Sequence, residues 1–271
     1  MIKRVITYPD AVTSLHATPE GLWVGHQGGL SYCDPNSGEA TSWTTADGLP
    51  AHPVTHITSS VVPEGADAAA AKRLVIATPN GVAWVDDRAA LLQETAETTQ
   101  RSWKRALTHE RGDGVHVNGV SLVGDWIYVT TGGGRIYFES EEGFKLIELP
   151  LEQARLLRIV PLPCAPTQRR LLIVTNNSGV LLLATGEREE PSLYQWGESE
   201  EMLSRYVTAI VRNETHVMIG VHGGIHFASI EDLVEHPGEL VRWGTVHLGS
   251  APASVEQKRI HDLVDHCLLY T

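Results

Sequence analysis

The sequence is poor in the features that mark disulfide-stabilised, zinc-binding or membrane-spanning proteins. Its three cysteines, Cys33, Cys164 and Cys267, are far apart and form no CxxC pair, which excludes a zinc knuckle or a thioredoxin-like motif. We therefore expect reduced, buried thiols. No apolar run approaches the roughly 20 residues of a membrane span, and residues 1–10 lack the apolar segment of a signal peptide. These absences favour a cytoplasmic protein that does not associate with a membrane.

Basic residues are also scarce. The chain has 21 Lys and Arg against 33 Asp and Glu, a formal net charge of −12. Nucleic-acid binding depends on a basic surface, so we expect no nucleic-acid partner. Aromatic residues make up only 6% of the chain, so the positions of the seven tryptophans carry information.

A Gly-bearing turn between two apolar strands recurs along the chain. The last glycines of the five turns are 52, 53, 45 and 45 residues apart, at Gly29, Gly81, Gly134, Gly179 and Gly224. A four-stranded unit that repeats every 40–50 residues is the signature of a β-propeller blade. The sequence therefore predicts an all-β propeller, a single domain over residues 1–271.

The first repeat predicts four strands, at residues 12–16, 22–25, 30–33 and 39–45, with a turn at residues 34–38. The inner strand of the next blade is predicted at residues 54–57. Four tryptophans fall on predicted outer strands and are interpreted as core residues at one equivalent register: Trp43, Trp103, Trp196 and Trp243. A row of sugar-stacking platforms is the alternative interpretation of these rings.

Insertions interrupt the repeat at three places. Residues 61–72 form a long loop in blade two, and residues 89–99 have the spacing of a short amphipathic helix. A helical turn is predicted at residues 230–235, with Ser229 as its N-cap. Such insertions lie on a propeller's surface and commonly meet partners.

The two terminal segments predict a sixth, composite blade. Residues 259–265 resemble an inner strand and residues 266–271 a second strand, and residues 1–8 could supply an outer strand. About six blades result: five complete ones and a sixth, incomplete blade with an open edge. Because unpaired strand edges invite association, another chain is expected to cover this edge.

Residues 22–54 resemble the repeat of the two-component-regulator propeller family. The matching residues are Leu22–Gly25, Gly28–Leu30, Tyr32, Asp34–Pro35, Gly38 and Asp47–Pro50. Blade five matches partly, at residues 218–220 and 223–225. The resemblance implies a propeller that senses or binds ligands, whereas the span and kinase usual in that family do not appear in this sequence.

Polar residues at the repeated turns form the candidate ligand site. His26, Asn80, Asn177 and His222 are predicted to lie on one face near the propeller axis, where convergent polar groups would form a binding site. Two imidazoles could also bind a transition metal there. The competing interpretation, which we prefer, is that these are ordinary turn residues, and no metal or cofactor is predicted.

No sequence motif identifies a reaction. A G-x-S-x-G elbow, a P-loop, an HExxH motif and sialidase-type Asp-boxes are all absent, and acidic pairs such as Asp86-Asp87 are interpreted as solvated surface. We therefore predict no catalytic residues and a non-enzymatic module, a protein-interaction or scaffold subunit of a bacterial complex. Its partner is expected at the open edge of the last blade or at the 61–72 and 88–99 loops. The alternative is a small-molecule sensor, or a lyase or hydrolase that uses the central face.

Overall fold

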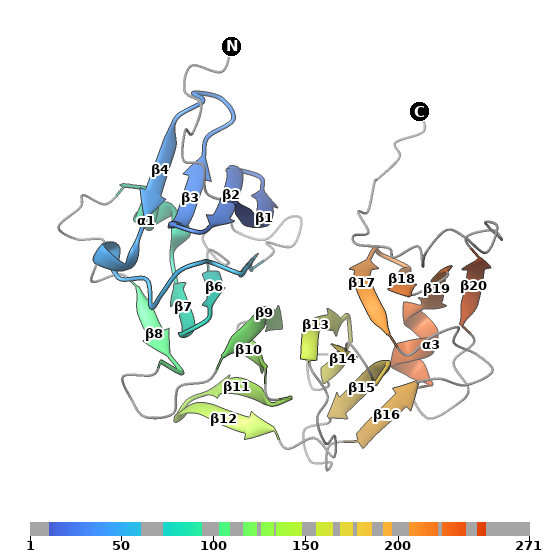
Figure 1. The fold of residues 1–271 in the computed structure, drawn as a ribbon. Helices are drawn as coiled ribbons and strands as arrows, with labels where there is room; N and C mark the ends of the chain where they lie inside the picture. The colour runs from blue at the N-terminus through green and yellow to red at the C-terminus, as the bar shows by residue number, and fades with distance from the viewer. Residues whose placement is uncertain are drawn as a thin grey trace, which may run out of the picture. The chain divides into compact units, whose positions relative to one another are not determined.

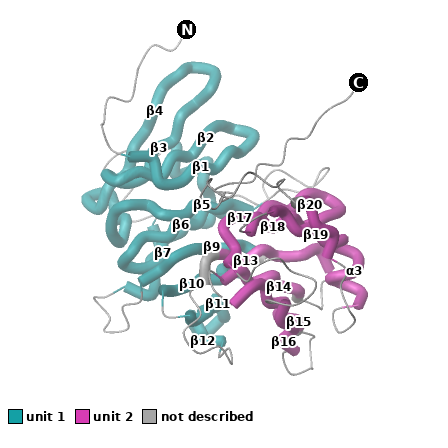
Figure 2. Tube along the Cα trace, turned by 45° about the vertical axis from the view of Figure 1, so that its right-hand side comes forward, with its two compact units in different colours: residues 1–152 teal, residues 153–271 magenta. Residues whose placement is uncertain are grey.

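The structure is a computed structural model. It describes residues 11–60, 73–93, 103–108, 116–123, 126–132, 134–147, 156–164, 169–175, 178–185, 192–196, 206–221, 224–236 and 243–247. The chain divides into two compact units, residues 1–152 and 153–271 (Figure 2). Each unit is described separately, and the single domain over residues 1–271 stays a prediction.

The fold is all-β and consists of five four-stranded antiparallel sheets. Within each sheet the strands follow one another in chain order (Figure 1), which is the connectivity of a propeller blade. We call the sheets blades one to five in chain order. The prediction of five four-stranded blades is confirmed, while the segments of the predicted sixth blade, residues 1–8 and 259–271, lie outside the described residues.

Unit 1 holds blades one to three. Their strands are β1 (Val12–Thr18), β2 (Gly21–His26), β3 (Gly29–Cys33), β4 (Ala40–Trp43); β5 (His56–Ser59), β6 (Leu74–Thr78), β7 (Gly81–Val85), β8 (Lys104–Ala106); and β9 (Val117–Val123), β10 (Trp126–Thr131), β11 (Ile136–Ser140), β12 (Gly143–Ile147). The first strands of successive blades, β1, β5 and β9, contact one another in turn. The three blades thus pack face to face around neighbouring inner strands.

Unit 2 holds blades four and five. Their strands are β13 (Leu156–Leu162), β14 (Arg169–Thr175), β15 (Val180–Thr185), β16 (Ser192–Trp196); and β17 (Val207–Arg212), β18 (His216–Val221), β19 (Gly224–Ser229), β20 (Gly244–His247). Helix α3 (Ile230–Glu235) follows β19 directly, as the sequence predicts. The expected Ser229 cap is wrong in one respect: its side chain makes no capping hydrogen bond, and the Ile230 N–H donates to the Thr215 carbonyl instead (2.9 Å).

The predicted insertions in blade two are described only in part. Residues 61–72 and 94–99 lie outside the described residues. The helix predicted at residues 89–99 begins one residue earlier, as α1 (Arg88–Gln93). Leu91 on this helix is buried in the cluster between blades one and two, and Leu92 packs against the same cluster. The apolar side of the helix therefore packs into the core.

The tryptophans are core residues. Trp43 and Trp103 lie in the cluster between blades one and two, and Trp243 lies in the cluster between blades four and five, with Trp196 packed against it. Their predicted common register is wrong. Trp43 and Trp196 are the last residues of their outer strands, whereas Trp103 and Trp243 immediately precede theirs, so the two pairs lie at opposite ends of those strands.

The turns of blade one explain its repeat motif. The Asp34 carboxylate accepts hydrogen bonds from the Asn36 N–H (2.8 Å) and the Ser37 hydroxyl (2.9 Å), while Gly38 closes the turn with a positive φ of 69°. Further along, Thr44 caps a short 3₁₀ helix, η1 (Thr45–Asp47), that Gly48 terminates in the left-handed region. The motif residues Asp, Gly and Thr therefore fix backbone reversals.

Candidate functional site

Two of the four predicted site residues are described, and both occupy turns of unit 1. His26 ends β2 at the β2–β3 turn, and Asn80 lies in the β6–β7 turn, where its amide donates to the Pro50 carbonyl at 3.5 Å. Asn177 and His222 lie outside the described residues, so the predicted ring of four residues stays a prediction.

Both ring nitrogens of His26 have partners within blade one. Nδ1 accepts a hydrogen bond from the Gly28 N–H at 3.1 Å, so Nε2 carries the proton and donates to the Ser31 hydroxyl at 3.0 Å. Ser31 Oγ lies 2.7 Å from Ser42 Oγ on the next strand. His26 therefore holds the turn and begins a polar ladder, His26–Ser31–Ser42, across β2, β3 and β4.

The ladder lies on the face of blade one that points away from blade two, and we call this the outer face of blade one. The pairing of Leu15 with Val24, and of Ala17 with Leu22, places all four side chains on that face. Leu15 is 63% exposed and Leu22 37%, and Val12 at the start of β1 is 58% exposed. The opposite face carries Trp23 and Leu30, which are fully buried. Blade one thus presents apolar side chains beside a polar ladder.

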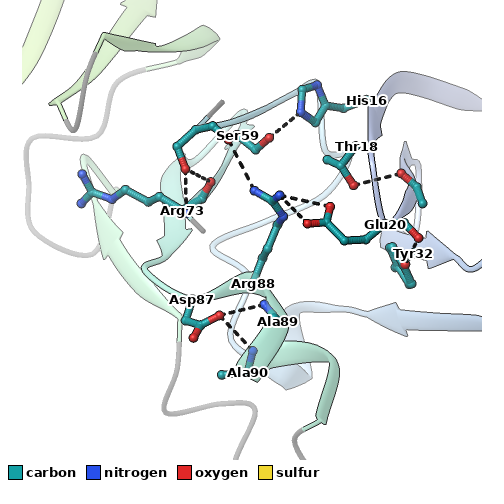
Figure 3. A network of polar contacts seen from close by, with 12 residues as sticks. His16, Thr18, Glu20, Tyr32, Ser59, Arg73, Asp87, Arg88, Ala89 and Ala90 are labelled. Carbon is teal, nitrogen blue, oxygen red and sulfur yellow. Dashed lines mark hydrogen bonds and ion pairs between the residues drawn. The ribbon is translucent and has the colours of Figure 1, made fainter. Parts of the chain in front are cut away.

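A buried arginine that sequence reasoning missed joins blades one and two. Arg88 is 5% exposed, and its Nη2 donates to both carboxylate oxygens of Glu20, at 2.8 and 3.1 Å (Figure 3). Glu20 lies in the β1–β2 turn, and Arg88 is the first residue of α1, which lies between β7 and β8 of blade two. The Asp87 carboxylate fixes the start of this helix, because it accepts from the N–H groups of Ala89 (2.9 Å) and Ala90 (3.1 Å).

The electrostatics of this cluster favour a charged carboxylate and a neutral imidazole. Burial is the largest single influence on the pKa of Glu20 and acts to raise it, but hydrogen bonds from Arg88, from the Glu20 backbone and from Thr18, together with the Arg88 charge, outweigh it and hold the pKa below its ordinary value. Burial, followed by the nearby Arg88 charge, lowers the pKa of His16. His16 Nε2 lies 2.9 Å from the Ser59 hydroxyl of β5, a second polar contact between blades one and two (Figure 3).

A second arginine of blade two reaches the blade on its other side. Arg73 makes a two-pronged ion pair with Glu139 of β11, with both nitrogen–oxygen distances at 2.7 Å, and a further ion pair with Asp86 at 3.2 Å. Lys104 also pairs with Asp86. Asp86 and Asp87 are exposed, as expected of a solvated acidic pair, yet each has a structural role. Blade two is therefore held by an arginine–carboxylate pair to each neighbouring blade.

The described residues show neither a metal cluster nor a membrane-spanning helix. No three His, Cys, Asp or Glu side chains in this part of the chain gather where they could hold a metal ion. No described helix is both long enough and apolar enough to span a bilayer. Cys33 and Cys164 are half-buried rather than buried as predicted, and burial raises the pKa of the Cys33 thiol.

Solved structures resemble this fold at low sequence identity. The extracellular domain of a putative one-component system, BT4673 from B. thetaiotaomicron, aligns with 89% of this chain at 12% identity and a TM-score of 0.56. BBS1N, solved in complex with ARL6DN, aligns with 80% at 12% identity and a TM-score of 0.51. The computationally designed Ika8 protein aligns with 82% at 13% identity and a TM-score of 0.50.

This chain spans only part of each of those structures: 29%, 64% and 59% of their chains, respectively. No family model matches the sequence, and no curated protein matches it. The likeness therefore shows the fold alone. It agrees with the predicted resemblance to regulator propellers through the one-component system, without establishing membership of that family.

Proposed function

We propose that this chain is a non-enzymatic binding module that contacts a partner protein through the outer face of blade one. The exposed apolar residues Val12, Leu15 and Leu22 support this, because exposed apolar side chains that cluster on one surface favour protein contact. The polar ladder that begins at His26 lies beside them with its groups paired inside blade one, and Ser31 is buried. The ladder therefore holds the sheet in place, and the apolar residues carry the proposed contact.

The structural neighbours support a binding role by analogy. One of them was solved in complex with another protein, and another is an extracellular domain of a putative one-component system. With a net charge of −12, the module would associate faster with a partner that carries a basic surface, and added salt would slow that association. A place in a cytoplasmic bacterial complex remains part of the proposal, with the 61–72 and 88–99 loops as further contact regions.

A pair of matched variants tests the blade-one surface. Leu15→Asp places a charge at its most exposed apolar residue, while Leu146→Asp changes a residue of β12 that is also exposed (42%). Tagged wild type and both variants are recovered from the same cells, and bound proteins are quantified by mass spectrometry. We expect Leu15→Asp to reduce a specific partner about tenfold or more, and Leu146→Asp to retain it. Equal recovery with both variants refutes the blade-one surface.

The ligand-sensor alternative is tested at His26. Because both ring nitrogens of His26 bond within blade one, His26→Ala is expected to disturb the turn and leave partner recovery within about twofold. Loss of function with His26→Ala, in a variant that still recovers its partner, would favour a ligand site on the central face.

A further inference from the structure

The two faces of blade five are both apolar, but only one is packed. Val217, Ile219 and Ala228 on one face are buried in the cluster shared with blade four. On the opposite face, which we call the outer face of blade five, Phe227 is 37% exposed and Val246 50%. This second face is the subject of the inference.

Strand register defines the outer face. Met218 pairs with Phe227, and Phe227 pairs with Gly244; Ile225 pairs with Val246 on the same side of the sheet. A Cβ atom at Gly244 would clash with the tip of the Phe227 ring, so this ring lies close against Gly244 of the outer strand β20. Together these residues form an apolar surface that runs over three strands.

The chain that follows β20 has the composition to cover this face. Residues 249–254 read Gly-Ser-Ala-Pro-Ala-Ser, a linker composition. Seven of the twelve residues 260–271 are then apolar or aromatic, among them Ile260, Leu263 and Leu268. An apolar segment after a polar linker needs a surface on which to bury its side chains.

The linker after β20 is long enough to let residues 260–271 reach the outer face of blade five. β20 ends at His247, which pairs with Gly224 at one end of the outer face. Residues 249–259 span up to about 35 Å when extended, whereas a six-residue strand of this blade is about 20 Å long. Tethering also gives the segment an effective concentration on the order of millimolar, far above that of a separate protein. The chain's own segment is therefore the favoured occupant.

We propose that residues 260–271 pack on the outer face of blade five, over Met218, Ile225, Phe227 and Val246. This segment is part of the predicted sixth blade, and the proposal names the surface that receives it. It is independent of the partner surface on blade one, since it concerns unit 2 and its own terminal segment. The blade-one variants and the blade-five variants can therefore fail separately.

Two reciprocal measurements on the full-length chain test the proposal. Trypsin cuts after Lys258 and Arg259, so release of residues 260–271, followed by intact mass, reports whether the segment is held. We expect Phe227→Ser and Val246→Ser each to speed that cleavage about tenfold. Leu22→Ser on blade one, at a residue as exposed as Phe227, is the matched control and should leave the rate unchanged.

The second measurement reports whether the outer face of blade five is covered. Met218 lies on it and is one of three methionines in the chain, so its oxidation by dilute peroxide can be followed by peptide mass spectrometry. Leu263→Ser with Leu268→Ser should speed Met218 oxidation about tenfold, while circular dichroism shows an unchanged fold. Val246→Ser, at a half-exposed position, keeps the test valid if Phe227→Ser does not fold.

Three results would overturn the proposal. Wild-type cleavage as fast as that of a free peptide with the same sequence means that the segment is not held. Cleavage and oxidation rates unchanged by the variants mean that it is held elsewhere. Protection that falls on dilution means that a second copy of the chain, or a separate partner, occupies the face.

Discussion

Removing Glu20 should destabilise the protein more than removing the charge of Arg88, although both changes break the same ion pair. The reason is the unequal burial of the partners: the Arg88 side chain is 6% exposed and that of Glu20 is 50% exposed. Glu20→Ala leaves a buried guanidinium that keeps a long, 3.5 Å hydrogen bond to the Ser60 carbonyl. Arg88→Met instead leaves a carboxylate that is already half in water.

The magnitudes follow from this asymmetry. Stranding a buried charge costs about 3–5 kcal/mol, and water that enters through the Glu20 site brings the value toward about 3 kcal/mol. Arg88→Met keeps most of the apolar stem and loses chiefly the pair itself, about 1 kcal/mol for a pair with one exposed partner. The double variant removes the stranded charge, so it should cost less than Glu20→Ala alone.

Urea unfolding, followed by tryptophan fluorescence and circular dichroism together, measures these free energies. The pKa of Glu20 is lowered in the folded state, so its contribution is present above the ordinary glutamate pKa of about 4.3 and is lost as the pH falls through the folded value. The deficit of Glu20→Ala should therefore shrink in acid. A cost for Arg88→Met that equals or exceeds that of Glu20→Ala, or strict additivity in the double variant, would refute the reasoning.

Two further predictions concern a turn and a histidine of blade one. Gly29 has a φ of 142°, and a Cβ there would clash with a carbonyl oxygen of β4, so Gly29→Ala should lower the free energy of unfolding by about 3 kcal/mol or more. Gly38→Ala, where a Cβ would have nothing within 4 Å, should lower it by about 1 kcal/mol. Urea unfolding measures both changes. The pKa of His16 is lowered by burial and by Arg88, so the unfolded chain binds the proton first as the pH falls below about 6.5. The melting temperature of the wild type should therefore fall between pH 7.5 and 5.5, and that of His16→Gln should fall less. If the melting temperatures of His16→Gln and of the exposed control His236→Gln change equally with pH, the prediction is wrong.

Local patterns made the blades predictable. The strands around the Gly-bearing turns are predicted to within one or two residues, because apolar runs and glycines with positive φ, such as Gly29 and Gly81, are properties of adjacent residues. The inner strand of blade two is less accurate. It is predicted at residues 54–57 and observed at His56–Ser59, because Val54 instead donates its N–H to the His26 carbonyl of blade one at 3.3 Å.

Contacts between distant residues were not predictable from one sequence. Arg88 and Glu20 are 68 residues apart, and no spacing rule connects an arginine between two strands of one blade with a glutamate in a turn of another. The tryptophan register failed for a related reason: α1 and the residues after it separate β7 from Trp103, so position relative to the glycine turn no longer fixes position on the outer strand. Of the site, the sequence could mark His26 as a turn residue but not its partners Ser31 and Ser42.

The two outer faces differ in a way that separates their proposed roles. On blade one, the His26–Ser31–Ser42 ladder runs beside the apolar residues, so the surface keeps its polar groups paired when it is free in water and tolerates repeated exposure. On blade five, Phe227 and Val246 are exposed, and the Phe227 ring lies close against Gly244 of β20, so the described part of this surface is apolar. A surface of that kind is most stable when it stays covered, because exposing it to water costs about 25 cal/mol per Å² of apolar area. A tethered segment provides permanent cover, whereas a mixed surface suits a partner that binds and leaves.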